Sequence, residues 1–418
     1  MNNEPDIAII GAGAAGIGAA RRLVGSGLSI LVLEALPRTG GRAWTRQAAS
    51  VPLDMGCEWL HSADRNPWTR IAEQSGFAVD RRPSAWDHQD GENGLTAEEW
   101  KDARQAFESW SERIATSPPA SDIAAEALEP GGRWTAYLQA MSGFISGDEL
   151  ERISARDYAT YDAASTYLNW RLPAGYGTLI TASLPTSIPL RLAAAVEEVR
   201  LDGRRVELRT SAGTVRPRAV ICTVSTNVLA GSAIAWPTAL DPWRDAASRL
   251  PLGDDEKLFL EITGDSPFAP ESHALGDPFD PATGSYYIRP FGQRIISCFL
   301  GGAGARAVAE RGAEAAFARA LDQLVSLFGA DVRRCLRPLV ASDWTRSPTI
   351  GGAYSHALPG HAEARTVLAR PYDNRLFFAG EATHVSDFST AHGAYLSGQR
   401  AAEEALAALA SGIHEPLI

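Results

Sequence analysis

Cysteine is scarce in this sequence, and long apolar runs are missing. The chain contains four cysteines, Cys57, Cys222, Cys298 and Cys335, and no two of them form a C-x-x-C pair. This spacing excludes a zinc knuckle and a redox dithiol, and scattered single cysteines are typical of a reducing compartment. No uninterrupted apolar segment approaches the roughly 20 residues of a membrane-spanning helix, so we expect no membrane association.

Positive charge is also in short supply. Lys and Arg number 39 against 50 Asp and Glu, which gives a formal net charge of -11. This balance argues against a nucleic-acid partner, which requires a basic face, and it mildly favours a cationic ligand. Plain solubility is the simpler explanation of the charge. The first residues, Met1-Asn2-Asn3-Glu4-Pro5-Asp6, are acidic and lack the positively charged N-terminal region of a secretory signal peptide. We therefore expect a cytoplasmic protein.

The N-terminal region does contain a nucleotide-binding pattern. Ile7-Ala8-Ile9-Ile10 is a continuous apolar run, typical of a buried parallel strand. Gly11-Ala12-Gly13-Ala14-Ala15-Gly16 follows and opens an Ala-rich helix that we expect to end near Val24, before a second strand over 28–33. This G-x-G-x-x-G pattern admits a pyrophosphate to the backbone and to the helix N-terminus. Glu34 follows the second strand, where an acid suits the ribose hydroxyls.

Two further segments favour FAD over NAD. Thr39-Gly40-Gly41-Arg42 follows the second strand, and Arg42 can bind a diphosphate bidentately. Near the end of the chain, Gly380-Glu381-Ala382 follows another apolar strand, and Gly393 lies at the start of the closing helix. A helix N-terminus aimed at a flavin stabilises the negative charge that develops on reduction.

Sequence patterns typical of a nucleotide-binding domain occur at the start, in the middle and at the end of the chain. We therefore predict an α/β protein with a discontinuous Rossmann-like FAD-binding domain and a second, mixed α+β substrate-binding domain. The predicted FAD-binding domain comprises 1–63, 186–245 and 365–418, and the substrate-binding domain comprises 64–185 and 246–364. Smaller predictions are a tight hairpin turn at Asp202-Gly203, a loop over 116–132 and amphipathic helices over 305–328 and 392–410.

Taken in order, these motifs resemble those of the flavin-containing amine oxidases, the group of monoamine and polyamine oxidases. The resemblance covers nearly the whole chain and is closest in motif to the polyamine oxidases. Besides the dinucleotide motif with Glu34, it rests on Gly40-Gly41-Arg42-Ala43, Leu53-Asp54-Met55-Gly56, Pro173-Ala174-Gly175-Tyr176-Gly177, Trp344, Gly351-Gly352-Ala353-Tyr354, Gly380-Glu381-Ala382-Thr383 and His392-Gly393-Ala394-Tyr395-Leu396-Ser397-Gly398.

The resemblance implies FAD as the cofactor. It places Glu34 at the adenosine ribose, Arg42 at the pyrophosphate, the Val196 backbone at the adenine, and Glu381 near the ribityl-phosphate. The predicted cofactor-binding residues are Gly11, Gly13, Ala15, Gly16, Glu34, Ala35, Gly41, Arg42, Val196, Trp344, Gly380, Glu381 and Ala391. Monoamine oxidases tether FAD through a Cys directly before an active-site Tyr. Ala353 takes that position here, so we expect non-covalent FAD.

By the same resemblance, Lys257, Tyr354 and His61 are the catalytic residues. Lys257 would hold a water near flavin N5, and the alternating segment 257–262 puts it on the strand face opposite the leucines. The pattern alone favours a solvated Lys in the acidic run 254–257, and only the family resemblance favours the functional role. Tyr354 would form one wall of an aromatic cage, which accommodates an amine as a cation or as a neutral group; a core tyrosine is the alternative.

Four residues form the predicted substrate-binding set, namely Glu58, Trp59, Phe388 and Thr390. Many relatives have a second cage Tyr at the position of Thr390. A Thr here resembles the animal-type polyamine oxidases, and Phe388 would supply part of the missing aromatic surface. His61 matches a histidine that contacts substrate nitrogen in polyamine oxidases. Relatives that act on amino acids usually place an Arg nearby, whereas Glu58 suits an ammonium group. The alternatives are a solvent-facing Glu58 and a packing His61.

We therefore expect oxidation of a small-molecule amine, with hydride transfer from the α-carbon to flavin N5. The products would be an imine or aldehyde and, with dioxygen as acceptor, hydrogen peroxide. A polyamine or diamine is the favoured substrate. The alternatives are monoamine oxidation, a desaturase or protoporphyrinogen-type oxidase of the same fold, and a non-catalytic FAD-stabilised scaffold protein. We expect no metal, because the histidines show no ligand spacing. A homodimer is compatible with the sequence.

Overall fold

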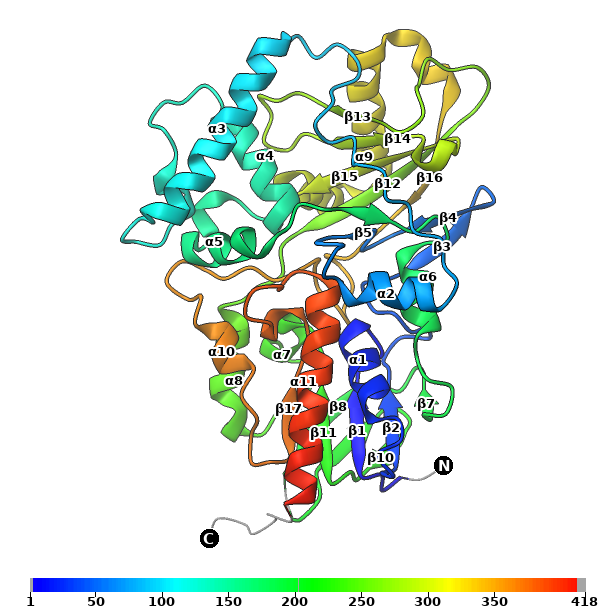
Figure 1. Ribbon diagram of the computed structural model, residues 1–418, viewed down its shortest axis with the longest axis vertical. Helices are drawn as coiled ribbons and strands as arrows, with labels where there is room; N and C mark the ends of the chain where they lie inside the picture. Colours follow the sequence, from blue (N-terminus) through cyan, green and yellow to red (C-terminus); the bar gives the residue numbers. More distant parts are fainter. Residues whose placement is uncertain (1–2, 202, 412–418) are drawn as a thin grey trace.

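The structure is a computed structural model that describes residues 3–201 and 203–411. A part built on a parallel sheet lies below a part built on an antiparallel sheet (Figure 1). This arrangement agrees with the predicted fold class of a Rossmann-like domain with a mixed α+β partner. In the described ranges, no helix combines the length and apolar character needed to cross a membrane.

The parallel sheet forms the centre of the lower part. Its strands are β1 (Ile7–Ile10), β2 (Ile30–Leu33), β7 (Leu190–Arg191), β11 (Ala219–Cys222) and β17 (Leu376–Phe378). They lie in the order β17-β11-β1-β2-β7, and each neighbouring pair is parallel. Every residue of β1, β2 and β11 is buried. Both faces of the sheet are covered, which is why these strands are uninterrupted apolar runs.

Two layers cover this sheet. One is formed by α1 (Ala14–Leu23) and α11 (Ala391–Ala410), which lie side by side and share a core with β1 and β11 (Figure 1). The other layer contains an antiparallel sheet of β8 (Val196–Arg200), β9 (Glu207–Thr210) and β10 (Gly213–Val215), with α7 (Thr226–Ala230), α8 (Asp241–Ser248) and α10 (Ala364–Leu368). Because segments from both ends and the middle of the chain build this part, it is discontinuous in sequence.

The upper part is built on a second sheet. Its strands are β12 (Asp255–Ile262), β13 (Ser272–Leu275), β14 (Ser285–Ile288), β15 (Ile295–Gly301) and β16 (Leu336–Ala341), in the order β13-β14-β15-β12-β16 and all antiparallel. Helix α9 (Ala303–Phe328) packs on one face. A cluster of α3 (Ala97–Thr116), α4 (Thr135–Ser146) and α5 (Ala155–Ala164) has its own core beside the sheet.

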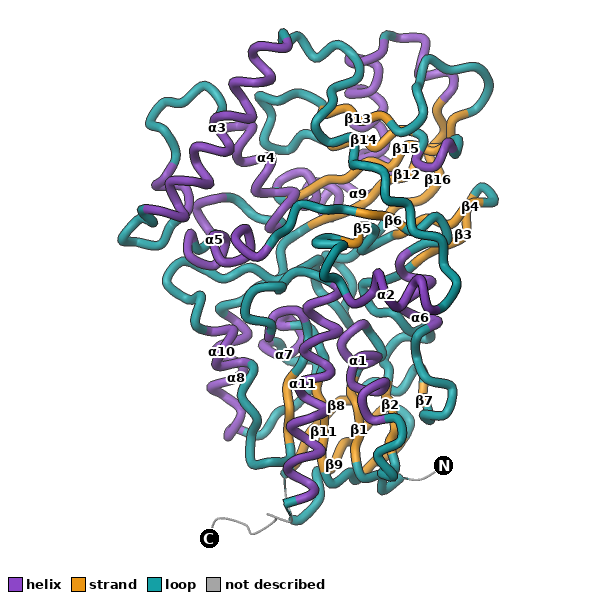
Figure 2. Tube along the Cα trace, in the orientation of Figure 1, coloured by secondary structure: helices purple, strands orange, loops and turns teal. Residues whose placement is uncertain are grey.

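Short elements and loops connect the two parts, and β5 and β6 lie between them (Figure 2). These elements are β3 (Thr45–Ala48), β4 (Val51–Asp54), β5 (Trp59–Leu60), β6 (Trp170–Arg171), α2 (Pro67–Gln74) and α6 (Tyr176–Ala182). Helices α2 and α6 belong to the predicted substrate segment 64–185, yet they share a core with Ile17 of α1 and Tyr395 of α11. The domain boundaries given above stay a prediction.

The local predictions differ from the structure in a few places. Short 3-10 helices occur at Ala124–Ala127, Leu150–Arg152, Thr238–Leu240, Pro290–Gly292, Ala330–Cys335 and Glu381–Thr383, the first of them inside the predicted loop 116–132. Helix α9 is interrupted at Gly312, whose φ is 84°. Strands β8 and β9 pair with Arg200 opposite Glu207, so their connection is longer than the predicted two-residue turn. Asp202 of that turn lies outside the described residues.

Candidate active site

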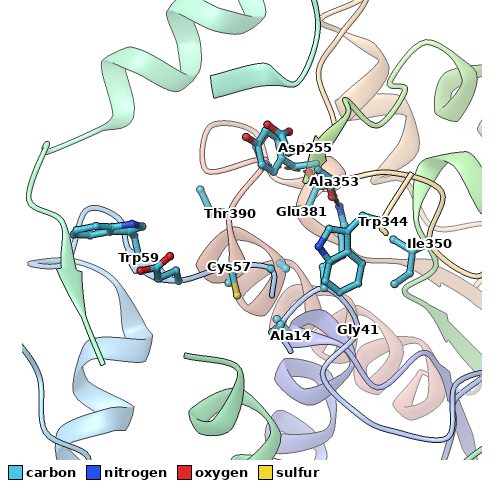
Figure 3. A pocket seen from close by; sticks show the side chains of 18 of the residues that line it. Ala14, Gly41, Cys57, Trp59, Asp255, Trp344, Ile350, Ala353, Glu381 and Thr390 are labelled. Atoms are coloured by element: carbon cyan, nitrogen blue, oxygen red, sulfur yellow. Dashed lines mark hydrogen bonds and ion pairs between the residues drawn. The ribbon is translucent and has the colours of Figure 1, made fainter. Parts of the chain in front are cut away.

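One cavity of about 720 Å³ extends from the N-terminus of α1 into the space beside β12 and the α3–α5 cluster. Its lower end lies at the carboxyl ends of β1 and β2, where doubly wound sheets bind their ligands. Part of this cavity is drawn in Figure 3. All the predicted site residues line it except Gly16 and Phe388.

The glycine turn at the cavity floor has the geometry that a pyrophosphate requires. Gly11 has a φ of 102°, and a Cβ at Gly16 would overlap the carbonyl oxygen of Gly11, so neither position admits a side chain. Gly16 therefore belongs to the turn although it does not touch the cavity. Gly13 precedes α1 and provides no side-chain cap for its first turn. The first-turn N–H groups are left for an anionic ligand.

Glu34 is fixed beside this turn. Its Oε2 accepts a hydrogen bond from the Ala12 backbone N–H at 2.7 Å, and its Oε1 accepts one from the Leu36 N–H at 2.9 Å. The side chain is buried and lines the cavity together with Ala35 and, from β8, Val196. Each carboxylate oxygen retains a second lone pair, which suits the ribose hydroxyls of an adenosine.

Arg42 and Glu381 form a partly buried ion pair that the sequence did not predict. Nη1 of Arg42 donates to Glu381 Oε1 at 2.9 Å and to the carbonyl oxygen of Ala353. Ser355 Oγ and the Ser389 N–H donate to the other carboxylate oxygen at 2.7 and 2.9 Å. Burial alone would raise the pKa of Glu381, but Arg42 and these donors hold it below its usual value. The carboxylate thus stays ionised and orients Arg42 at the cavity wall.

Lys257 is buried and points toward the cavity. Leu258 and Leu260 of β12 lie in the core of the upper sheet, whereas Lys257 is on the opposite strand face. Its Nζ donates to Glu58 Oε2 at 2.8 Å and to the Asp54 carbonyl oxygen at 3.1 Å. Only 7% of Lys257 is exposed, so the alternative of a solvated Lys does not describe it.

Glu58 lines the cavity, and its carboxylate is paired with Lys257. Its contact with a substrate ammonium group stays a prediction. The side chains of the pair are 17% and 9% exposed. At this degree of burial an unpaired charge is costly. The ion pair therefore holds the Glu58 and Lys257 side chains in place.

His61 is held in one tautomer. Its Nδ1 lies 2.7 Å from Asn169 Oδ1, and the Asn169 amide donates to the Tyr167 carbonyl oxygen at 3.0 Å. Because Asn169 Oδ1 can only accept, Nδ1 carries the proton and Nε2 keeps its lone pair. Burial lowers the pKa of His61 to about 4. His61 is thus a neutral hydrogen-bond acceptor at the cavity wall.

Aromatic rings form the wall next to His61. The ring of Trp59 lies 4.5 Å from that of Trp86 and 5.6 Å from that of Tyr287, measured between centroids. All three residues line the cavity. Such faces favour the methylenes of a substrate and tolerate a cation.

The predicted cage is only partly present. Tyr354 lines the cavity, and its hydroxyl donates to the Phe144 carbonyl oxygen at 2.7 Å. Thr390 also lines it, but its hydroxyl caps α11 by accepting from the Gly393 N–H at 2.9 Å, so its methyl group is what remains for a substrate. The structure does not bring Phe388 to the cavity, because its ring packs against Tyr161 and the guanidinium of Arg365. Tyr161, which packs against Phe388, lines the cavity.

The sequence analysis missed one cavity residue with unusual surroundings. Asp255, the first residue of β12, lines the cavity and is 3% exposed. Its acidic neighbours in the sequence suggested a solvated run. The signal that could have found it is the two-residue alternation of β12, which puts Asp255 and Lys257 on the same strand face.

A dinucleotide site open to a second, aromatic chamber is typical of FAD-dependent oxidoreductases. The sequence model of a family described as flavin-containing amine oxidoreductases matches residues 14–158 and 101–406. Polyamine oxidase 3 of Oryza sativa subsp. japonica is 27% identical over 443 residues, covering 96% of this chain and 89% of that protein. Polyamine oxidase 2 of Arabidopsis thaliana is 27% identical over 447 residues, covering 96% and 88%.

A solved structure has the same fold. Cyclohexylamine oxidase from Brevibacterium oxydans IH-35A matches with a TM-score of 0.78 at 20% identity, over 97% of this chain and all of that one. The chain belongs to the family of flavin-containing amine oxidoreductases. It is a FAD-dependent amine oxidase, as the motifs predicted.

Proposed function

We propose that this enzyme oxidises a diamine or polyamine, with FAD bound non-covalently. The observation that carries the proposal is the charge of the substrate chamber. Glu58, Asp162, Asp255 and an exposed Asp87 line it, whereas its cations are Lys257, which is paired with Glu58, and an exposed Arg104. An excess of carboxylates among aromatic rings suits an extended polycation. The polyamine oxidases among its relatives add support.

His61, Lys257 and Glu58 each have a part in the proposed reaction. FAD held in this cavity would supply the hydride acceptor for the amine α-carbon, and dioxygen is the proposed final acceptor. The reacting nitrogen must be neutral, and the His61 Nε2 lone pair can accept its N–H while the aromatic walls exclude water. Lys257 would orient a water or the reacting group, with Glu58 fixing its ammonium.

The adenosine half of the cofactor would lie at Glu34 and Val196, and the pyrophosphate at the first turn of α1 and at Arg42. Non-covalent binding is supported by Ala353, which offers no thiol. Cys57 is the cysteine that lines the cavity, and burial raises the pKa of its thiol to about 12, so it stays protonated and unreactive.

The proposal is tested by an amine panel. The purified enzyme is mixed with putrescine, spermidine, n-butylamine, benzylamine and a free amino acid, and hydrogen peroxide is measured. We expect kcat/KM to be highest for putrescine or spermidine. A benzylic monoamine or an amino acid as the best substrate would contradict the proposal, and the amine-oxidase assignment would remain.

A further inference from the structure

Asp255 is a buried carboxylate without a partner in the described part of the chain. The residue is 3% exposed, and neither carboxylate oxygen has a hydrogen-bond partner there. Figure 3 shows its side chain at the cavity, above Ala353 and on the far side of Thr390 from Trp59. Burying a carboxyl group without hydrogen-bond partners is costly, so the presence of Asp255 at a cavity points to a ligand that contacts it.

Comparable carboxylates of this protein are satisfied internally. Asp157 receives two hydrogen bonds from Arg365, at 2.7 and 2.8 Å. Glu256, the next residue along β12, is 1% exposed and accepts from Ser342 Oγ and from the Thr345 N–H at 3.0 Å. Asp255 is therefore an exception that the packing of buried acids does not explain.

The groups nearest to Asp255 are already engaged. The Tyr354 hydroxyl beside it donates to the Phe144 carbonyl oxygen, and Lys257, on the same strand face, is held by Glu58. A Cβ at Gly147, whose φ is 74°, would lie 2.7 Å from Asp255 Oδ2, so glycine leaves room beside the carboxylate. Burial, with Asp254 and Glu256 nearby, raises the pKa of Asp255 well above its usual value, although Tyr354 opposes this shift. An incoming cation would return it to the ionised form.

We propose that Asp255 binds the non-reacting ammonium group of a diamine or polyamine, and so determines substrate specificity. This inference rests on the function proposed above. Asp255 and Lys257 are two residues apart on one strand face, which separates them by about 7 Å along the strand. A short aliphatic chain can span that distance, with one nitrogen reacting near Lys257 and the other held at Asp255. The Tyr354 ring lines the same cavity and would cover the methylenes.

The test compares Asp255→Asn with the matched control Glu256→Gln, which neutralises a buried acid that does not line the cavity. We measure kcat/KM for putrescine and for n-butylamine, which has the same carbon chain without the second nitrogen. Loss of one charged contact should lower kcat/KM for putrescine by about 10- to 150-fold in Asp255→Asn. The value for n-butylamine should change less than about threefold, and Glu256→Gln should keep the wild-type preference for putrescine.

Binding provides a second readout without turnover. Under anaerobic conditions, putrescine should raise the melting temperature of the wild type more than n-butylamine does, and Asp255→Asn should lose this difference. Without a ligand, Asp255→Asn should change the melting temperature little near neutral pH, because the raised pKa of Asp255 leaves its carboxyl group uncharged in the unliganded wild type. If Asp255→Asn does not fold, Asp255→Glu keeps the charge on a longer side chain and should shift the preference toward a shorter diamine.

The outcomes separate the two proposals. If the wild type prefers putrescine to n-butylamine and Asp255→Asn keeps that preference, the role of Asp255 is overturned and the proposed function stands. If the variant loses both activities by the same factor, or if Asp255→Glu leaves the chain-length preference unchanged, the role of Asp255 is likewise overturned. If the wild type does not prefer any diamine or polyamine, both proposals fall.

Discussion

The ion pair between Glu58 and Lys257 allows the sharpest test of the site. Replacing Glu58 by Gln removes the charge of the acceptor 2.8 Å from Lys257 Nζ, where the side chains are 17% and 9% exposed. Removing one partner of a buried pair outright costs about 3–5 kcal/mol. Because Gln keeps one acceptor oxygen, we expect a loss of about 1.5–3 kcal/mol in the free energy of unfolding.

A double-mutant cycle with Lys257→Met isolates this interaction. Equilibrium denaturation at a fixed FAD concentration gives the free energy of unfolding of the wild type, both single variants and the double variant. Glu58→Gln should cost much less when Lys257 is already Met. The matched control is Glu73→Gln, which removes the charge from the pair with Arg81, whose side chains are 46% and 56% exposed. That exposed pair should contribute less than about 1 kcal/mol.

The same variant tests whether Glu58 positions Lys257 or binds substrate. If it positions Lys257, Glu58→Gln and Lys257→Met should slow anaerobic flavin reduction by putrescine and by n-butylamine to similar extents, at unchanged FAD occupancy. Additive stability effects in the cycle, or a loss confined to putrescine, would refute the positioning role.

Three further predictions concern the cofactor and the histidine. Acid precipitation should release all FAD into the supernatant, because Ala353 offers no thiol and burial raises the pKa of Cys57 to about 12; flavin left on the denatured polypeptide would contradict this. Glu34→Ala should weaken FAD binding by about 10- to 150-fold in Kd, measured by fluorescence titration of the apoprotein, because the ribose loses a charged acceptor; an unchanged Kd would place the ribose elsewhere. Burial lowers the pKa of His61 from 6.5 to about 4, so between these pH values the unfolded state binds a proton that the folded state does not. Stability should therefore fall by up to roughly 3 kcal/mol as pH falls through this window, and His61→Gln should flatten that part of the profile.

The cofactor site was predictable because its constraints are local. Gly11 has a positive φ that side chains disfavour, and a Cβ at Gly16 would overlap the Gly11 carbonyl oxygen, so both constraints lie within one tight turn. The apolar runs before and after that turn fix the neighbouring strands. A short segment of sequence therefore contains most of the physical information about this end of the cavity.

The substrate chamber was less predictable because its contacts join distant segments. Nothing near Glu58 in the sequence indicates that its partner is Lys257, 199 positions away. The run from Asp254 to Lys257 resembles a solvated charge cluster, yet Asp255, Glu256 and Lys257 are all buried, each with a different environment. Phe388 was misplaced for a similar reason, since the guanidinium that covers its ring comes from Arg365, on a separate helix.

Anaerobic reduction of the flavin tests the central claim most directly, because it reports the amine half-reaction without any contribution from dioxygen. The oxidised enzyme is mixed with equal concentrations of putrescine, spermidine, n-butylamine, benzylamine and an amino acid, and flavin bleaching is followed by absorbance. We predict that putrescine or spermidine bleaches the flavin fastest. Faster bleaching by benzylamine or by the amino acid would contradict the account, as would a flavin that no amine in the series reduces.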